Sequence, residues 1–103
     1  MANIVQLSIL RQGVEVWNKW RSKNPEVKVD LSGVDLRESN LYRFDLSDVN
    51  LSSALLRGTN LRESKLFSSD LSGVCFSEAD LKDADLRQAD LRHADHQGAA
   101  PGL

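Results

Sequence analysis

The sequence is poor in several features that would point to a particular class of protein. It has one cysteine in 103 residues, Cys75, so no disulfide can form within the chain. It has no run of about 20 apolar residues, which argues against a membrane-spanning helix. The N-terminus lacks the charged start, apolar segment and cleavage site of a secretory signal peptide. We therefore expect one small domain in a reducing compartment, most simply the cytoplasm.

Few residues suggest catalysis, a cofactor or a bound metal. The two histidines, His93 and His96, stand beside aspartates near the C-terminus, and such a pair is a weak signal for a metal site. Most aspartates recur at one position of a short repeat, where they suit turns by hydrogen-bonding the local backbone. No phosphate-binding loop or catalytic triad stands out. The sequence therefore predicts a protein that is not an enzyme, with no catalytic, cofactor-binding or metal-binding residues and no cofactor.

Charge is nearly balanced overall but is divided unevenly along the chain. The formal net charge is −2. Residues 1–28 hold five basic and two acidic residues, a local charge of +3, which leaves −5 for the remainder. Neither part is charged enough to predict binding to nucleic acid or to a membrane surface.

What the sequence has in abundance is leucine at a spacing of five residues. Every fifth residue from 31 to 91 is leucine, except Phe76, which gives thirteen repeats in a row. Asp or Asn usually stands directly before this position, and a small or apolar residue stands two before it. Five residues advance about 500° on an α-helix, and an odd spacing alternates between the two faces of a straight strand. The chain must therefore turn once per repeat and stack its turns into a solenoid.

The repeats "VDLSG VDLRE SNLYR FDLSD VNLSS" and "EADLKDADLRQADLR" resemble those of the pentapeptide repeat family, whose consensus is A(D/N)LXX. The resemblance covers residues 29–93. It implies an all-β solenoid, a right-handed quadrilateral β-helix with four pentapeptides per coil, here with an N-terminal α-helical cap. The stretch "GVEVWNKWRSKNPEVKVDLSG" also resembles a leader found before such repeats in cyanobacterial proteins.

If four repeats make one coil, residues twenty apart lie directly above one another. Leu36, Leu56 and Phe76 would then share one inner stack. Leu55 and Cys75, which replace the usual Asp or Asn, would be neighbours on an outer face. The inward-facing hydroxyl groups of the repeats should bond to backbone carbonyls, because buried polar groups need partners.

Three parts of the chain are predicted. Residues 1–28 form an N-terminal helix with its connector, residues 29–95 form a β-helix of about three coils, and residues 96–103 form a disordered tail. The helix itself is predicted to run without a break over residues 3–24. Its apolar arc is wider than one coil end needs, so we expect it to cap the first coil and to leave apolar surface for a partner.

Two candidate interaction surfaces follow from these patterns. The first lies on the N-terminal helix, with Trp17 and Trp20 as apolar contacts and Gly13 allowing close backbone approach. The second is the C-terminal edge of the β-helix, where His96 replaces the next leucine and the repeat stops. Unpaired strand groups and apolar surface are expected there, at the following positions: Leu81, Leu86, Ala89 and Leu91.

Several explanations of this C-terminal edge stay open. A second copy of the chain could cover it end to end, which is the arrangement we predict. The tail could instead fold back over the edge, the sequence could be a piece of a longer protein, or the closing "GAAPGL" could be foreign to it.

The sequence favours a non-enzymatic structural or protein–protein interaction module, a rigid prism whose protein partner it does not identify. The alternative is a DNA-mimic inhibitor of a topoisomerase such as gyrase, because some pentapeptide repeat proteins resemble duplex DNA. Three coils span only about 15 Å at the ~4.8 Å spacing of strands. Arginines also interleave with the aspartates, whereas duplex DNA carries a negative charge every ~1.7 Å. Contacts with nucleic acid or a membrane are not expected.

Overall fold

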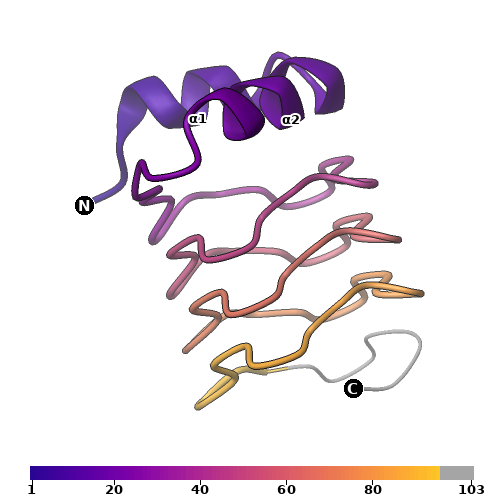
Figure 1. The fold of residues 1–103 in the computed structure, drawn as a ribbon. Helices are drawn as coiled ribbons and strands as arrows, with labels where there is room; N and C mark the ends of the chain where they lie inside the picture. Colours follow the sequence, from indigo (N-terminus) through magenta and orange to yellow (C-terminus); the bar gives the residue numbers. More distant parts are fainter. Residues whose placement is uncertain (96–103) are drawn as a thin grey trace.

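The computed structural model describes residues 1–95, which form two short helices followed by a stack of coils (Figure 1). Helix α1 spans Ile4–Leu10 and helix α2 spans Val14–Lys23. Both helices lie across one end of the stack, and the chain then winds away from them (Figure 1). No helix in residues 1–95 is both long enough and apolar enough to cross a bilayer. The disorder predicted for residues 96–103 lies outside the described residues.

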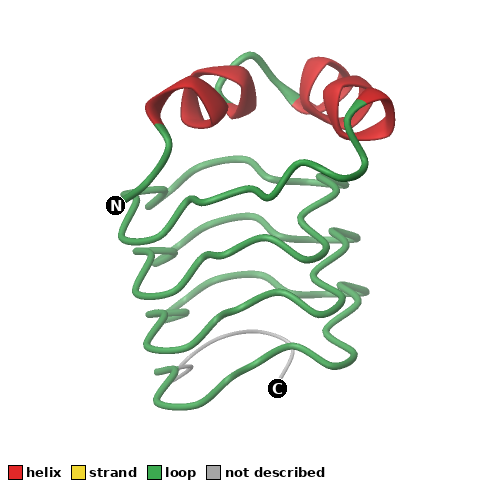
Figure 2. Cartoon of the chain, turned by 60° about the vertical axis from the view of Figure 1, so that its left-hand side comes forward, coloured by secondary structure: helices red, strands yellow, loops and turns green. Residues whose placement is uncertain are grey.

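Successive coils are joined by parallel backbone bridges between residues twenty apart. The first bridge pairs Asp30 with Asn50, and Leu55 pairs with Cys75 as the sequence predicted. The predicted coil of four pentapeptides is thus confirmed. Each bridge involves a single residue on either side because the chain turns again within every repeat. In residues 1–95 these isolated bridges replace the longer strands expected of an all-β fold (Figure 2).

Each repeat turns at the second residue after the leucine, where the backbone has a positive φ. Gly33, Gly58 and Gly73 occupy this corner with φ values of 68° to 69°. Other residue types adopt the same conformation at ten further corners between residues 38 and 93, with φ between 56° and 62°. The left-handed conformation costs a non-glycine residue roughly 1–2 kcal/mol. Hydrogen bonds between coils offset this cost; for example, Glu38 N–H donates to the Arg57 carbonyl at 2.9 Å.

The Asp or Asn before the leucine shapes the start of this turn. Its side-chain oxygen accepts a hydrogen bond from the N–H two residues further on, as in the 2.9 Å bond from Ser32 N to Asp30 Oδ1. The same bond recurs at most repeats from Asp35 to Asp90. The structural role predicted for these aspartates is confirmed.

The leucines fill the interior of the solenoid. Leu56 and Phe76, two members of one predicted stack, are fully buried. The inward-facing hydroxyls of Thr59, Ser64 and Ser69 each donate to a leucine carbonyl at 2.7 Å, which confirms the predicted pairing. The core therefore contains no buried side-chain N or O atom without a partner among the described residues.

The N-terminal segment differs from the prediction of one continuous helix over residues 3–24. It breaks at residues 11–13, and Gly13 is the N-cap of α2 with φ 107° and ψ 173°. Only glycine adopts this region readily, because a Cβ would clash with the backbone. Asn3 is the N-cap of α1, and its side chain accepts from Gln6 N at 3.0 Å. The break lets α1 and α2 lie over different parts of the first coil (Figure 2).

Candidate functional site

Helix α1 closes one face of the first coil with backbone and side-chain amide groups. The coil edge there would otherwise leave the Asp30 N–H and carbonyl without partners. Gln6 Oε1 accepts from Asp30 N at 2.9 Å, Gln6 Nε2 donates to the Lys28 carbonyl at 2.9 Å, and Asn3 N donates to the Asp30 carbonyl at 2.8 Å. The buried Gln6 amide therefore takes the place that a peptide group of a further coil would occupy.

Helix α2 closes the fourth face of the first coil in the same way. Asn18 Oδ1 accepts from Asp45 N at 2.8 Å, and Asn18 Nδ2 donates to the Arg43 carbonyl at 3.0 Å. Trp17 Nε1 donates to the Asp45 carbonyl at 2.8 Å. Gln6 and Asn18 thus make the same pair of bonds, each to a bridge residue and to the carbonyl two residues before it.

The second and third faces of the first coil have no such closure. Asp35 and Asn40 stand at the positions equivalent to Asp30 and Asp45. Among residues 1–95, neither their backbone N–H groups nor their carbonyls have a hydrogen-bond partner. The connection between the two helices arches above the coil at this place (Figure 2).

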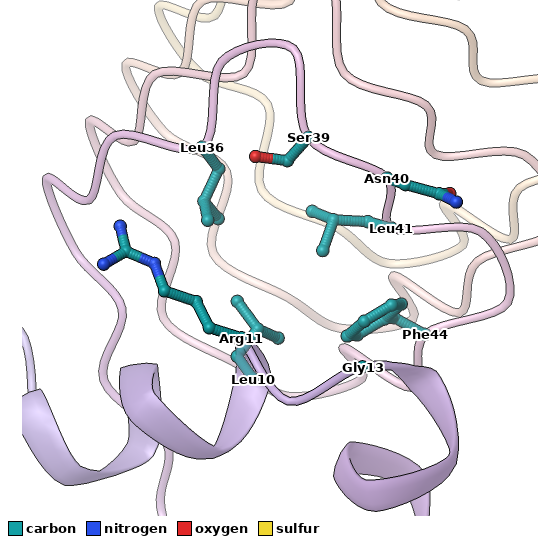
Figure 3. A pocket seen from close by; sticks show the side chains of 8 residues that line it. All are labelled: Leu10, Arg11, Gly13, Leu36, Ser39, Asn40, Leu41 and Phe44. Atoms are coloured by element: carbon teal, nitrogen blue, oxygen red, sulfur yellow. The ribbon is translucent and has the colours of Figure 1, made fainter.

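A pocket of about 260 Å³ lies between this connection and the two uncapped faces. Leu36, Leu41 and Phe44 face Leu10 across it (Figure 3). Gly13, Ser39 and Asn40 also line the pocket, and the Asn40 side chain points away from it (Figure 3). Arg11 is the one charged residue that lines the pocket, and its side chain extends along the rim (Figure 3).

The structure separates the residues of the predicted N-terminal surface. Trp17 is fully buried, so its prediction as a partner contact is wrong: the indole ring belongs to the core and its N–H holds the coil edge. Trp20 is half-buried against it, with ring centroids 5.3 Å apart. Gly13 serves the helix break, and beyond its own chain neighbours a Cβ there would meet nothing within 4 Å. Close approach of a partner to Gly13 therefore stays a prediction.

Apolar side chains remain on the outer surface of the helices. Ile4 is 80% exposed and Val5 is 70% exposed on α1, and Val16 is 42% exposed on α2. Val5 and Val16 belong to the wide apolar arc of the predicted helix. The prediction that part of this arc stays outside the core is therefore confirmed.

The C-terminal edge keeps part of the predicted apolar surface. Leu81 is buried at 4% exposure, whereas Leu86 and Leu91 are half-buried. Ala89 is also half-buried. Among residues 1–95, the N–H groups of the three leucines have no partner, although the equivalent Leu61 N donates to the Asp80 carbonyl at 2.8 Å. The role of this edge as an interface stays a prediction.

Ion pairs cover the sides of the solenoid. Three arginines pair with the aspartate two residues before them at 2.7 Å, as Arg37 does with Asp35. Hydrogen bonds from the arginine side chain and then from its backbone N–H lower the pKa of Asp35, Asp85 and Asp90 to about 2. An ion pair also links successive coils, with Arg57 Nε 3.5 Å from Glu78 Oε2. The side surface thus alternates charges of both signs.

Within residues 1–95, no group of three or more His, Cys, Asp or Glu residues is placed to hold a metal ion. His96, half of the weak histidine signal, lies outside the described residues. The Cys75 thiol is half-buried and lies 3.4 Å from Ser77 Oγ. Its bridge partner Leu55 is 39% exposed, so the two form the predicted outer pair.

Sequence reasoning missed the residues that attach the cap. The Gln6 side chain bonds to the first coil. Its position within an apolar helix arc was a signal, because a polar side chain on a buried face needs a partner. Asn18 carried no comparable signal.

Comparison with known proteins identifies the repeat. A family model for pentapeptide repeats matches residues 45–83 in eight copies. The crystal structure of a pentapeptide repeat protein from Nostoc PCC 7120 matches 65% of this chain and 55% of its own, with 42% identity and a TM-score of 0.64. A pentapeptide repeat protein from the Arabidopsis thaliana thylakoid lumen matches 68% of this chain and 52% of its own, with 33% identity and a TM-score of 0.47. The chain thus spans about half the length of these structures. No curated protein matches.

Proposed function

Because this chain is a pentapeptide repeat protein, we propose that it is a non-enzymatic structural or interaction module, a rigid prism that presents its C-terminal edge to another protein. In this proposal the prism is the right-handed, four-sided β-helix expected from the repeats. The bridges between residues twenty apart support such a shape.

The exposure gradient along the leucine stacks carries this proposal. Leu46 and Leu66 are fully buried, but Leu86, the next member of the same stack, is half-buried. Leu71 and Leu91 differ in the same way. A contact that completes the burial of Leu86 and Leu91 would be favoured by about 25 cal/mol for each Å² of apolar surface removed from water.

The partner we propose for this edge is a second copy of the chain. Light scattering behind size exclusion, over a dilution series, should detect a dimer that dissociates on dilution. Leu86→Glu with Leu91→Glu should give a monomer, because a charged side chain cannot be buried in the contact without a partner. The control is Leu55→Glu, which changes an exposed leucine on a side face. A monomer at every concentration would remove this proposal.

The alternative, a DNA-mimic inhibitor of a topoisomerase such as gyrase, has weaker support. A mimic needs a dense and continuous negative surface, because duplex DNA has a charge every ~1.7 Å. In this chain, Asp35, Asp85 and Asp90 each pair with a neighbouring arginine. A gyrase supercoiling assay separates the two functions. We expect no inhibition, and inhibition at low micromolar protein would favour the mimic.

A further inference from the structure

The two uncapped faces of the first coil form a second, independent site. Its hydrogen-bonding groups are those of Asp35 and Asn40, whose N–H and carbonyl groups have no partner among residues 1–95. On the capped faces the equivalent N–H groups donate to the side-chain amides of Gln6 and Asn18. The equivalent carbonyls accept from Asn3 N and Trp17 Nε1. The edge therefore accepts groups that both donate and accept hydrogen bonds, as a peptide backbone does.

The solenoid itself shows how a peptide fits such an edge. One coil further on, Leu55 N donates to the Val34 carbonyl at 2.9 Å, and the Leu55 carbonyl accepts from Leu36 N at 2.9 Å. Val34 and Leu36 point inward and are buried. A peptide lying parallel to residues 34–38 could bond to Asp35 in the same register, with alternate side chains entering the pocket. The pocket's apolar wall of Leu10, Leu36 and Leu41 suits aliphatic side chains.

Charge selects among such peptides. Arg11 lines the pocket and is exposed, and no ion pair to it occurs within residues 1–95. The nearby Asp35 carboxylate is held by Arg37 through two hydrogen bonds, at 2.8 and 2.7 Å. Glu38 turns toward the next coil, where its carboxylate lies over Gly58. The rim is therefore left with one net positive charge, which favours an acidic peptide.

A second copy of the chain does not suit this site. A complete coil of another copy would need all four faces of the first coil, and α1 and α2 already bond to two of them. Only a short segment has room beside the helices. We propose that the uncapped faces and the adjoining pocket bind an extended acidic segment of a partner protein, with an aliphatic residue in the pocket and its backbone paired to Asp35.

The test titrates the isotopically labelled protein with a synthetic peptide of sequence DADLD, blocked at both ends, and follows the backbone amide signals by NMR. We expect saturable shifts of the Asp35 and Asn40 amide signals, with a dissociation constant on the order of 0.1–1 mM, because the contact is small. The matched peptide KAKLK should bind at least about fivefold more weakly, because it places like charge beside Arg11. Absence of shifts at both amides, or equal binding of the two peptides, would overturn the proposal.

Variants distinguish this site from the rest of the surface. Arg11→Glu should weaken DADLD binding about fivefold to tenfold. Lys19→Glu changes charge equally at an exposed position on α2 that does not line the pocket, and it should leave binding within about twofold. If both variants lost the same affinity for DADLD, binding would depend on net charge alone, and the proposed site would be wrong. Leu86→Glu with Leu91→Glu should not alter binding, so the outcome is independent of the proposed C-terminal contact.

Hydrogen exchange of the free protein gives a second measurement. The Asp30 and Asp45 amides are bonded to the cap, whereas those of Asp35 and Asn40 have no partner in residues 1–95. After correction for sequence, the second pair should exchange at least about tenfold faster. Equal protection of all four amides would mean that the edge is already closed, and would exclude the peptide site.

Discussion

The helical cap and the repeat body both close the edge of a coil, but they do so with different groups. Both must pair the backbone groups at the edge of a coil and cover its leucines. The body does so with the backbone of the next coil, so that many different outward side chains are tolerated. The cap does so with a few particular side chains, above all Gln6, Trp17 and Asn18. Stability should therefore be concentrated in individual residues at the N-terminal end and distributed over the repeats elsewhere.

The largest expected effect comes from Trp17, which serves the cap in two ways. Trp17→Ala removes a fully buried ring and leaves the Asp45 carbonyl without its donor. We expect the free energy of unfolding to fall by about 3–5 kcal/mol in a urea titration. Trp20→Ala, which truncates the half-buried neighbour, should cost less than about 2 kcal/mol. Equal losses would contradict the special position of Trp17.

A substitution at Gln6 can remove hydrogen bonds of the cap with little change in side-chain volume. Gln6→Met keeps the side-chain length but removes the bonds to Lys28 and Asp30. The unfolding free energy should fall by about 1–3 kcal/mol, because a buried donor and acceptor lose their partner. Gln12→Met, at an exposed position between the helices, is the control and should change stability by less than about 0.5 kcal/mol. A neutral Gln6→Met would show that apolar contact alone holds α1.

Replacing one glycine in the cap and one in the body compares the backbone strain of the two regions. Gly13→Ala should cost about 1–3 kcal/mol, because φ 107° with ψ 173° is a conformation that only glycine adopts readily. Gly33→Asn should cost less than about 1 kcal/mol, because its φ of 68° is the left-handed region that asparagine tolerates. Thermal unfolding of both variants measures the difference, and the reverse order would contradict the assignment of strain to the helix break.

The smallest effect concerns the surface carboxylates of the body. Hydrogen bonds from arginine lower the folded-state pKa of Asp35, Asp85 and Asp90 to about 2, below the unfolded value near 3.8. Their stabilising contribution is therefore complete above about pH 4 and is lost as the pH falls toward about 2. Unfolding titrations across this range should show the loss.

The control for this pH dependence replaces the three arginines. Arg37→Gln, Arg87→Gln and Arg92→Gln together remove the charged partners at 2.7 Å. The combined variant should lose less stability than the parent protein between pH 4 and pH 2. Identical slopes would contradict the role assigned to these pairs. The effect stays small because all three pairs are exposed to solvent.

The repeat body was largely predictable from the sequence, because each of its rules recurs at every pentapeptide. The spacing of leucines predicted a stacked solenoid, and the resemblance to pentapeptide repeats implied its twenty-residue coil. The position of Asp30 and its equivalents predicted the turn bonds. The cap was predicted less well because each of its contacts occurs once. The helix break depends on Gly13, and a single glycine within a helical pattern does not distinguish a break from a tolerated residue.

The candidate sites divide in the same way. Leu86, Ala89 and Leu91 could be placed at the end of the core because their position follows from the repeat. The pocket beside Arg11 could not, since it depends on which faces the two helices leave uncovered. That outcome is set by the contacts of Gln6 and Asn18, which lie far in sequence from the residues they bind.

The coil of twenty residues also fixes how this molecule can change in length. Inserting four repeats would add one coil, separate the two ends by a further ~4.8 Å and leave their relative orientation unchanged. Inserting one repeat would instead turn the C-terminal edge by about a quarter of a revolution about the long axis, with almost no change in length. Duplication of a single pentapeptide would therefore change the angle between the cap and the C-terminal edge while leaving the distance between them almost unchanged.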